Sequence, residues 1–368
     1  MTLLHDRPAA ADARQRPQRR SAAAAAVAVA AAVALLVAGP PTTTTPAPAG
    51  RVDAAQAWPK AQRADFDPVL PDGPLFTPLL FLDTTTALGT APTPDARWVR
   101  LMLWTKPAAT PRELRRLPLE SNPQFEAATA AGDDLVWTES TDNKHLQIWH
   151  ARRSGGSAAL LTTDTGDALF YGNSFDLVVA DGRVHWAAAA KDRKLTDIRS
   201  APMAGGDVDI RSEQGEWALS TWPWLVDEQE ARLRNLSTSR DAEVVTSGPE
   251  LATCGPVWCR VMVMGGEGLA RIDLMHPDGS ERRRIAGGGA QAAVTDVAVL
   301  DRFELLAEAG PDADVTGTAT LLAYDTATAR TVAVAKEVDG TFTSGGMLWW
   351  STGDDDSITW HALDLRTI

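Results

Sequence analysis

The chain is short of cysteine, of tyrosine and of positive charge. It has 2 Cys and 2 Tyr among 368 residues, and 35 Lys and Arg stand against 48 Asp and Glu, which gives a formal net charge of −13. An acidic protein repels phosphate backbones, so we expect no nucleic-acid partner. Two thiols are too few for a cysteine zinc site, because such a site needs four ligands.

Motifs for catalysis are also missing. The sequence has no G-x-S-x-G, no glycine-rich phosphate loop after a strand and no helical H-x-x-x-H pair. The six histidines fit ordinary turn and strand positions: His5, His145, His150, His185, His276 and His361. We therefore predict no catalytic residue and no cofactor.

One long apolar run is present, near the N-terminus. Residues 22–38 contain only Ala, Val and Leu, and with Ser21 and Gly39 the run would form a helix of about 28 Å, close to the thickness of a membrane core. Residues 1–20 hold five Arg and two Asp. The asymmetry predicts a cytoplasmic tail at 1–20, a signal-anchor helix at 21–39 and an exported remainder. A cleaved signal peptide, which would give a secreted protein, is the alternative.

The segment that follows is rich in Pro, Thr and Ala. Residues 40–50 read PPTTTTPAPAG, and further prolines stand at Pro59, Pro68 and Pro71. This composition is typical of an extended, disordered spacer, so we assign 40–72 to a linker and 73–368 to the folded domain.

The folded part contains a repeat of about 40 residues. Each unit has an apolar run that ends in a Trp-like anchor, and a second apolar run 10 to 17 residues later. The first anchors are Trp104, Trp137, Trp186, Trp222, Trp258, Leu305 and Trp349, and the second are Leu114, Ile148, Ile198, Leu233, Ile272, Leu322 and Trp360. Four short strands per unit predict an all-β, seven-bladed β-propeller, or a six-bladed one if the first unit is not a blade.

The last unit ends after its third strand, which would leave an open sheet edge. We predict that Thr77–Asp83 supplies the outer strand of this blade and closes the ring. Six of the seven first anchors are Trp, and we expect them to pack between blades because each buries a large area.

Three stretches resemble known repeats. DGRVHW at 181–186 and IRSAPMAGG at 198–206 are similar to the repeats of TolB-type and WD40-like β-propellers, and LLAYDTATA at 321–329 resembles the quinoprotein form. The resemblance covers roughly residues 75–368 and implies a propeller fold. TolB-like proteins act as interaction platforms of the cell envelope, so it also implies that class of function.

The two cysteines, Cys254 and Cys259, are separated by a Gly-Pro turn sequence. A lone pair of thiols in an exported domain is most simply a disulfide, and the turn would bring the sulfurs together.

Several loops remain as candidates for binding. Asp312 and Asp314 open a D-x-D pattern, but the chelating Glu of a calcium loop is absent, so we predict no metal site and name them only as the nearest candidates. Residues 353–360 match part of an Asp-box, which is a turn element. Loops between second and third strands belong to one face of a propeller, and there we place the possible binding residues Lys191, Arg193, Trp222, Trp224 and Asp227.

These features together predict a membrane-anchored, extracytoplasmic propeller that binds a protein or glycan of the cell envelope without catalysis. The alternative is a propeller enzyme, such as a hydrolase, lyase or quinoprotein, with its site in the central funnel. Inward polar residues with perturbed pKa values at one mouth would favour the enzyme, whereas small and apolar tunnel walls would count against it.

Overall fold

The computed structural model describes residues 51–368, except 108–109, 143, 193, 228–231, 248–249, 267, 311–312 and 355–356, and except the side chains of 144 and 314. The expected tail and membrane helix lie outside the described residues. Within the described part, no helix is both long and apolar enough to cross a membrane. Arg51–Ile368 forms one compact unit.

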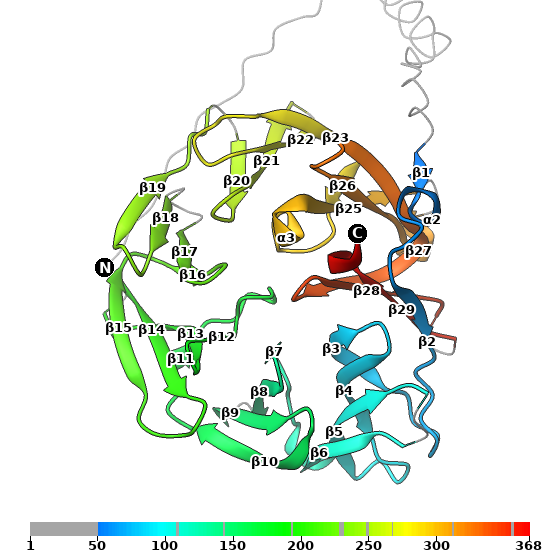
Figure 1. Cartoon of the computed structure of the whole chain (residues 1–368), viewed down its shortest axis with the longest axis vertical. Helices are drawn as coiled ribbons and strands as arrows, with labels where there is room; N and C mark the ends of the chain where they lie inside the picture. Colours follow the sequence, from blue (N-terminus) through cyan, green and yellow to red (C-terminus); the bar gives the residue numbers. More distant parts are fainter. Residues whose placement is uncertain are drawn as a thin grey trace, which may run out of the picture. The chain divides into compact units, whose positions relative to one another are not determined.

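Antiparallel sheets stand around a ring in this unit (Figure 1). The first holds β3 (Thr77–Asp83), β4 (Thr86–Pro92), β5 (Trp98–Thr105) and β6 (Arg112–Pro118). The second holds β7 (Ala128–Ala131), β8 (Asp134–Thr141), β9 (Lys144–Arg152) and β10 (Gly155–Thr162). The third holds β11 (Asp167–Ala168), β12 (Val178–Ala180), β13 (Arg183–Ala189), β14 (Leu195–Pro202) and β15 (Asp209–Gln214).

Two more four-stranded sheets continue the ring. One holds β16 (Ala218–Leu219), β17 (Trp224–Asp227), β18 (Arg232–Asn235) and β19 (Arg240–Glu243). The other holds β20 (Glu250–Cys254), β21 (Cys259–Gly265), β22 (Gly268–Met275) and β23 (Arg283–Gly287). In four of these five sheets the first strand along the chain, β3, β7, β16 or β20, lies nearest the centre (Figure 1).

The last sheet has eight strands and uses both ends of the folded unit. Its path is β2 (Arg63–Phe66), β29 (Thr359–Asp364), β28 (Met347–Thr352), β27 (Arg330–Ser344), β26 (Ala319–Asp325), β25 (Phe303–Ala309) and β24 (Ala290–Ala292). The short β1 (Val52–Asp53) also pairs with β27. The first half of β27 pairs with β26 and its second half with β28, so this strand joins two groups of strands. Short helical turns complete the chain: α2 (Ala54–Ala57), α3 (Val299–Arg302), α4 (Ala313–Thr316), η1 (Leu119–Ser121) and η2 (Leu365–Thr367).

The arrangement is that of a β-propeller, as the resemblance implied. Most anchors of the later units fall on the strands where the repeat placed them, whereas Trp222 and Trp258 lie in the turns just before β17 and β21. Trp137 and Ile148, for example, lie on the second and third strands of their sheet, β8 and β9. The first unit is one strand out of register, because Trp104 lies on β5 and Leu114 on β6, the third and fourth strands.

This shift arises because the repeat did not predict a strand at β4. β4 reads TALGTAP, which has no large apolar residue besides Leu and has little β-propensity. Its small residues fit a close approach, since a Cβ on Gly89 would lie 2.3 Å from the Thr77 carbonyl oxygen of β3. Packing against β3 therefore makes this segment a strand, although its own composition does not.

The predicted closing strand was wrong, although closure by an N-terminal strand was right. Thr77–Asp83 is the inner strand of the first sheet, whereas β2 pairs antiparallel with β29 and covers its edge. Phe66 at the end of β2 is 1% exposed, and its ring lies 5.4 Å from that of Phe81 and 5.2 Å from that of Trp104. The expected linker at 40–72 was wrong for residues 51–72, because β1, α2 and β2 belong to the folded unit, and its residues 40–50 lie outside the described residues.

The core consists of separate apolar clusters between neighbouring sheets. Trp186 packs with Val136 and Ile148 of the preceding sheet, and Trp258 packs with Leu306 and Leu322 of the following one. The Trp anchors at 104, 137, 186, 258 and 349 are all buried. The predicted packing role therefore holds for these five anchors, whereas the sixth, Trp222, is half-buried and lines a cavity. Burial between the sheets stabilises the ring.

Candidate ligand site at the centre of the ring

A cavity of about 590 Å³, which we call the large cavity, lies at the centre of the ring. Its walls come from the inner strands of several sheets and from the segment between β11 and β12. The lining residues are Pro78, Leu79, Glu126, Ala127, Ala128, Gly172, Asn173, Ser174, Asp176, Leu177, Arg260, Ala292, Ala293, Val294, Thr295, Asp296, Thr341, Phe342, Thr343, Ser344 and Trp349. Strands from opposite sides of the ring meet only at its axis, so this cavity occupies the central channel.

Residues 169–177, which we call the septum, cross this channel. Ser174 and Leu177 line both the large cavity and a second one of about 260 Å³, and Asn173 lines both the large cavity and a third of about 50 Å³. The septum therefore separates the large cavity from the two smaller ones.

Two buried carboxylates hold the septum in place. Asp176 accepts hydrogen bonds from three backbone N–H groups, those of Tyr171 (2.9 Å), Gly172 (2.7 Å) and Asn173 (3.3 Å). Asp296, from the chain between β24 and β25, accepts from the N–H and hydroxyl of Ser174. The Asp176 bonds therefore stabilise the septum internally, and the Asp296 bonds connect it with the other side of the ring.

Neither carboxylate has a cation beside it among the described residues. Thr343 on β27 donates its hydroxyl to Asp296 at 2.7 Å, and the partners of Asp176 are uncharged. Burial raises the pKa of Asp176 above its ordinary value, the three N–H groups oppose this, and the negative charge of Asp296 raises the pKa further. The guanidinium of Arg260 lies on the same wall and donates to the backbone carbonyl oxygen of Asp296 at 3.4 Å, but it forms no ion pair with either carboxylate.

A buried ion pair positions the segment that presents Asp296. Arg260 on β21 and Glu304 on β25 lie 2.7 Å apart, with side chains 4% and 0% exposed. Arg260 also donates to the carbonyl oxygens of Val294 and Thr295, and Glu304 accepts from the N–H of Ala298. The pair therefore ties two neighbouring sheets to this segment.

The same segment has an unusual backbone. Ala298, Leu300 and Asp301 have φ values of 45°, 59° and 56°, in the left-handed region where each non-glycine residue costs on the order of 1 kcal/mol. Glu304 holds Ala298, and the indole N–H of Trp258 donates to the Asp301 carbonyl oxygen at 2.9 Å. Such strain persists where surrounding contacts impose it, and it is common at binding sites.

The wall of the large cavity also offers aromatic and unpaired polar groups. Phe342 is 45% exposed and stacks on Trp349 with ring centroids 5.8 Å apart. The Nε1 of the buried Trp349 and the Nε of Arg260 have no hydrogen-bond partner among the described residues. Glu126 is exposed on the same wall.

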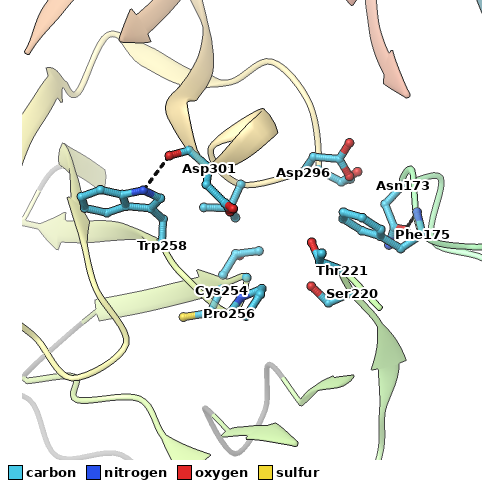
Figure 2. Close-up of a pocket in the computed structure, with 13 residues that line it drawn as sticks. Asn173, Phe175, Ser220, Thr221, Cys254, Pro256, Trp258, Asp296 and Asp301 are labelled. Atoms are coloured by element: carbon cyan, nitrogen blue, oxygen red, sulfur yellow. Dashed lines mark hydrogen bonds between the residues drawn. The ribbon is translucent and has the colours of Figure 1, made fainter. Parts of the chain in front are cut away.

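The smallest cavity lies next to the predicted disulfide. Cys254 and Cys259 are joined, which confirms the prediction, and they face each other across the β20–β21 hairpin. Figure 2 shows Ser220, Thr221 and Asp296 on one side of this cavity, and Trp258, Cys254 and Pro256 on the other. The hairpin loop thus forms part of the wall of the channel.

The loop residues singled out from the sequence do not form one site. Lys191 is exposed on the loop between β13 and β14. Trp222 packs on the His185 ring at 3.8 Å and lines the 260 Å³ cavity, whereas Trp224 packs against the next sheet. The prediction that Asp227 is a binding residue on a loop was wrong, because its side chain is buried at the end of β17 and pairs with Arg232 at 2.9 Å.

Three other candidates from the sequence cannot be placed. Arg193 and Asp312 lie outside the described residues, and so does the side chain of Asp314. Among the described residues, no three His, Cys, Asp or Glu side chains come together as metal ligands would.

The residues at the centre of the ring were not predicted from the sequence. Ser174, Asp176 and Asp296 belong to no motif, and sequence separations of more than 100 residues divide the septum from its partners. The one available signal was the long, Gly- and Asn-containing stretch between two short strands, which would be unusual for an inner propeller strand.

No protein-family model and no curated protein sequence matches the chain. Among solved structures, it is similar to the β-propeller domain of the Trilobed protease from Pyrococcus furiosus, with 10% identity, a TM-score of 0.44, and coverage of 65% of this chain and 82% of that one. It is also similar to a puromycin-hydrolyzing peptidase of Mycobacterium tuberculosis, with 12% identity, a TM-score of 0.47, and coverage of 80% and 52%. A third is YCF48 bound to D1 peptide, with 11% identity, a TM-score of 0.45, and coverage of 85% and 97%. The chain spans about half the length of the peptidase.

Proposed function

We propose that this protein is a membrane-anchored, extracytoplasmic β-propeller that acts as a non-enzymatic binding module of the cell envelope, with a protein or glycan as its partner. The observation that carries the proposal is the cavity of about 590 Å³ at the ring centre, which combines apolar walls with a few convergent polar groups. Ligand sites generally have this size and composition.

The carboxylates of this cavity are engaged with the chain itself. Both oxygens of Asp176 accept backbone N–H groups, and both oxygens of Asp296 accept from Ser174. A general base must reach the proton that it removes, and these oxygens instead hold the septum. Their arrangement favours a fixed binding shape over proton transfer.

The proposed location depends on the N-terminal sequence. Arg-rich residues 1–20 precede the apolar run at 22–38, and the Cys254–Cys259 disulfide is typical of exported proteins. Protein from membranes should begin at or near Met1. A secreted product that begins beyond residue 38 would contradict the anchor.

We also infer seven blades. The eight-stranded sheet contains two groups of four strands that meet at β27, and the other five sheets supply one blade each. A crystal structure in which β28 and β29 extend the layer of β24–β26 as one blade would contradict this count.

A propeller enzyme is the second candidate. Asp176 has a raised pKa and lies in the same cavity as Ser174 and Asp296, and perturbed carboxyl groups in clefts are common in active sites. In this case Asp176 would act as an acid in a hydrolase or lyase.

One experiment separates the two functions. The full-length protein is incubated with arrays of synthetic peptides and envelope glycans, and each retained compound is then analysed by mass spectrometry. Thr341→Trp should fill the cavity and abolish retention, whereas Thr331→Trp, on the same strand but outside the cavity lining, should not. Unaltered masses support binding without catalysis, and cleaved products support the enzyme. Retention that survives Thr341→Trp, or no retention at all, contradicts a binding site at the ring centre.

A further inference from the structure

The cavity of about 260 Å³, which we call the second cavity, lies across the septum from the large cavity. Leu80 and Leu82 of β3 and Val179 of β12 give it apolar walls. Arg366 is the only charged residue in its described lining, and its guanidinium donates to both oxygens of Asp364, at 2.7 and 2.8 Å. A charged ligand would therefore lose water here without meeting an unpaired opposite charge, so the second cavity favours an uncharged ligand.

Flat side chains form one part of this wall. Trp222 and Phe175 both line the second cavity, are partly buried and pack against the same apolar cluster. The ring of His185 lies 3.8 Å from that of Trp222 and holds it in place. Aromatic pairs gain more than their buried area provides, and a guanidinium such as that of Arg366 also stacks on aromatic faces. The lining therefore favours an aromatic ring over an aliphatic group of the same size.

Unengaged hydroxyl groups are a second, independent feature of the same wall. Thr129, Thr221 and Ser344 line the second cavity, and their hydroxyls form no hydrogen bond with any other described residue. None of these hydroxyls is a fully buried atom, so each can donate to a ligand or accept from it. Ligand pockets combine apolar walls with a few polar groups of this kind. An amide next to the aromatic ring would match them.

We propose that the second cavity is a ligand site for an uncharged aromatic ring that carries a neutral polar group such as an amide. The ring packs on Trp222 and Phe175, and the hydroxyls of Thr129, Thr221 and Ser344 bind the polar group. The volume of about 260 Å³ lies below that of sites for drug-sized ligands, so it suits a single ring system. A free aromatic amide and an aromatic side chain with its peptide bond share this chemistry, and the test separates them.

The test measures binding of N-acetylphenylalaninamide to the full-length protein in lipid nanodiscs by ligand-detected NMR. We expect a dissociation constant on the order of 1 mM, as is usual for a ligand of this size. The cyclohexylalanine analogue lacks only the aromatic character of the ring and should bind about threefold more weakly. Raising the salt concentration should change neither affinity, because both ligands are uncharged.

A peptide identifies the source of the ring. Acetyl-Gly-Phe-Gly-amide presents the same side chain within a chain of peptide bonds. Tighter binding of this peptide than of N-acetylphenylalaninamide would assign the site to a partner polypeptide. Weaker binding would assign it to a free small molecule, and either result agrees with the aromatic ligand that we propose.

Variants place the site in the second cavity. Thr221 is exposed and its side chain bonds to no other described residue, so Thr221→Trp should fill the mouth of the cavity and weaken binding at least about tenfold. Thr163→Trp makes the same change at an exposed position outside the cavity lining and should have no effect. Trp222→Leu should remove most of the preference for phenyl over cyclohexyl.

Equal affinities of the phenyl and cyclohexyl ligands for the unaltered protein would overturn the proposal, as would equal effects of Thr221→Trp and Thr163→Trp. No binding of either the amide or the peptide would overturn it too. Tighter binding of a neutral glucose oligomer would overturn it in favour of a glycan. The function proposed above is tested separately, because it depends on the large cavity. If Thr341→Trp blocks retention of array ligands while no aromatic amide binds, the second site fails and that function stands.

Discussion

The buried carboxylates of this protein fall into two groups with opposite surroundings. Between sheets, Glu304 and Glu139 are each paired with an arginine of a neighbouring sheet, Arg260 and Arg115. At the ring centre, Asp176 and Asp296 accept only N–H and O–H groups. Paired charges hold one sheet to the next, whereas the carboxylates at the centre hold the septum through hydrogen bonds to uncharged groups.

The largest expected effect comes from breaking a paired carboxylate. Arg260→Met leaves Glu304 buried without a cation and should lower the free energy of unfolding by about 3–5 kcal/mol. Denaturant titration measures it. In the double variant with Glu304→Gln, the amide oxygen still accepts from Ala298, so much of the loss should be recovered. Equal losses in the single and double variants would show that the pair does not act through charge.

A smaller loss of stability is expected at the centre of the ring. Ser174→Ala removes a hydroxyl donor to Asp296 and should cost about 1–2 kcal/mol. Amide exchange of residues 169–177 should accelerate much more than that of the inner strands, because the septum is attached to the opposite side of the ring through few bonds. Ser157→Ala, at an exposed position on β10, serves as the control. Unchanged exchange in the septum would mean that Asp296 does not hold it.

The smallest effect is a difference in pH dependence between Asp176 and Glu250, a half-buried carboxylate paired with Arg282, which directly precedes β23 of the same sheet. A hydrogen bond from Arg282 lowers the pKa of Glu250, so its stabilisation is present above its ordinary value of 4.5 and is lost as the pH falls through the lowered pKa. Burial raises the pKa of Asp176 above its ordinary 3.8, so its contribution is present below that value and is lost as the pH rises through the raised pKa.

The two variants should therefore respond in opposite directions. Glu250→Gln should reduce the loss of stability in acid, and Asp176→Asn should reduce the loss as the pH rises, each by less than about 1 kcal/mol. Unfolding by denaturant at a series of pH values measures both. Parallel pH profiles for the two variants would contradict the distinction between paired and unpaired carboxylates.

The repeat predicted the all-β class and most strand positions because each sheet repeats its apolar pattern locally. Trp137 and Ile148 could be assigned from spacing alone, and they are buried as expected. The prediction of the first unit failed because β4 consists mostly of small residues, and its strand conformation depends on packing against β3. The prediction of the closing strand failed for a similar reason, because it too depends on contacts outside the segment itself. β2 is only four residues long, and its partner β29 lies almost 300 residues away.

The sequence by itself determined the propeller class, the packing role of the Trp anchors and the disulfide. Each depends on residues close together in the chain: periodic apolar runs, or two cysteines around a Gly-Pro turn. Only the tertiary structure decided which strand closes the ring and which residues meet at its centre. Ser174 comes from the third sheet, and Asp296 and Thr343 come from two parts of the eight-stranded sheet. Only the closed ring brings their polar groups within hydrogen-bonding distance.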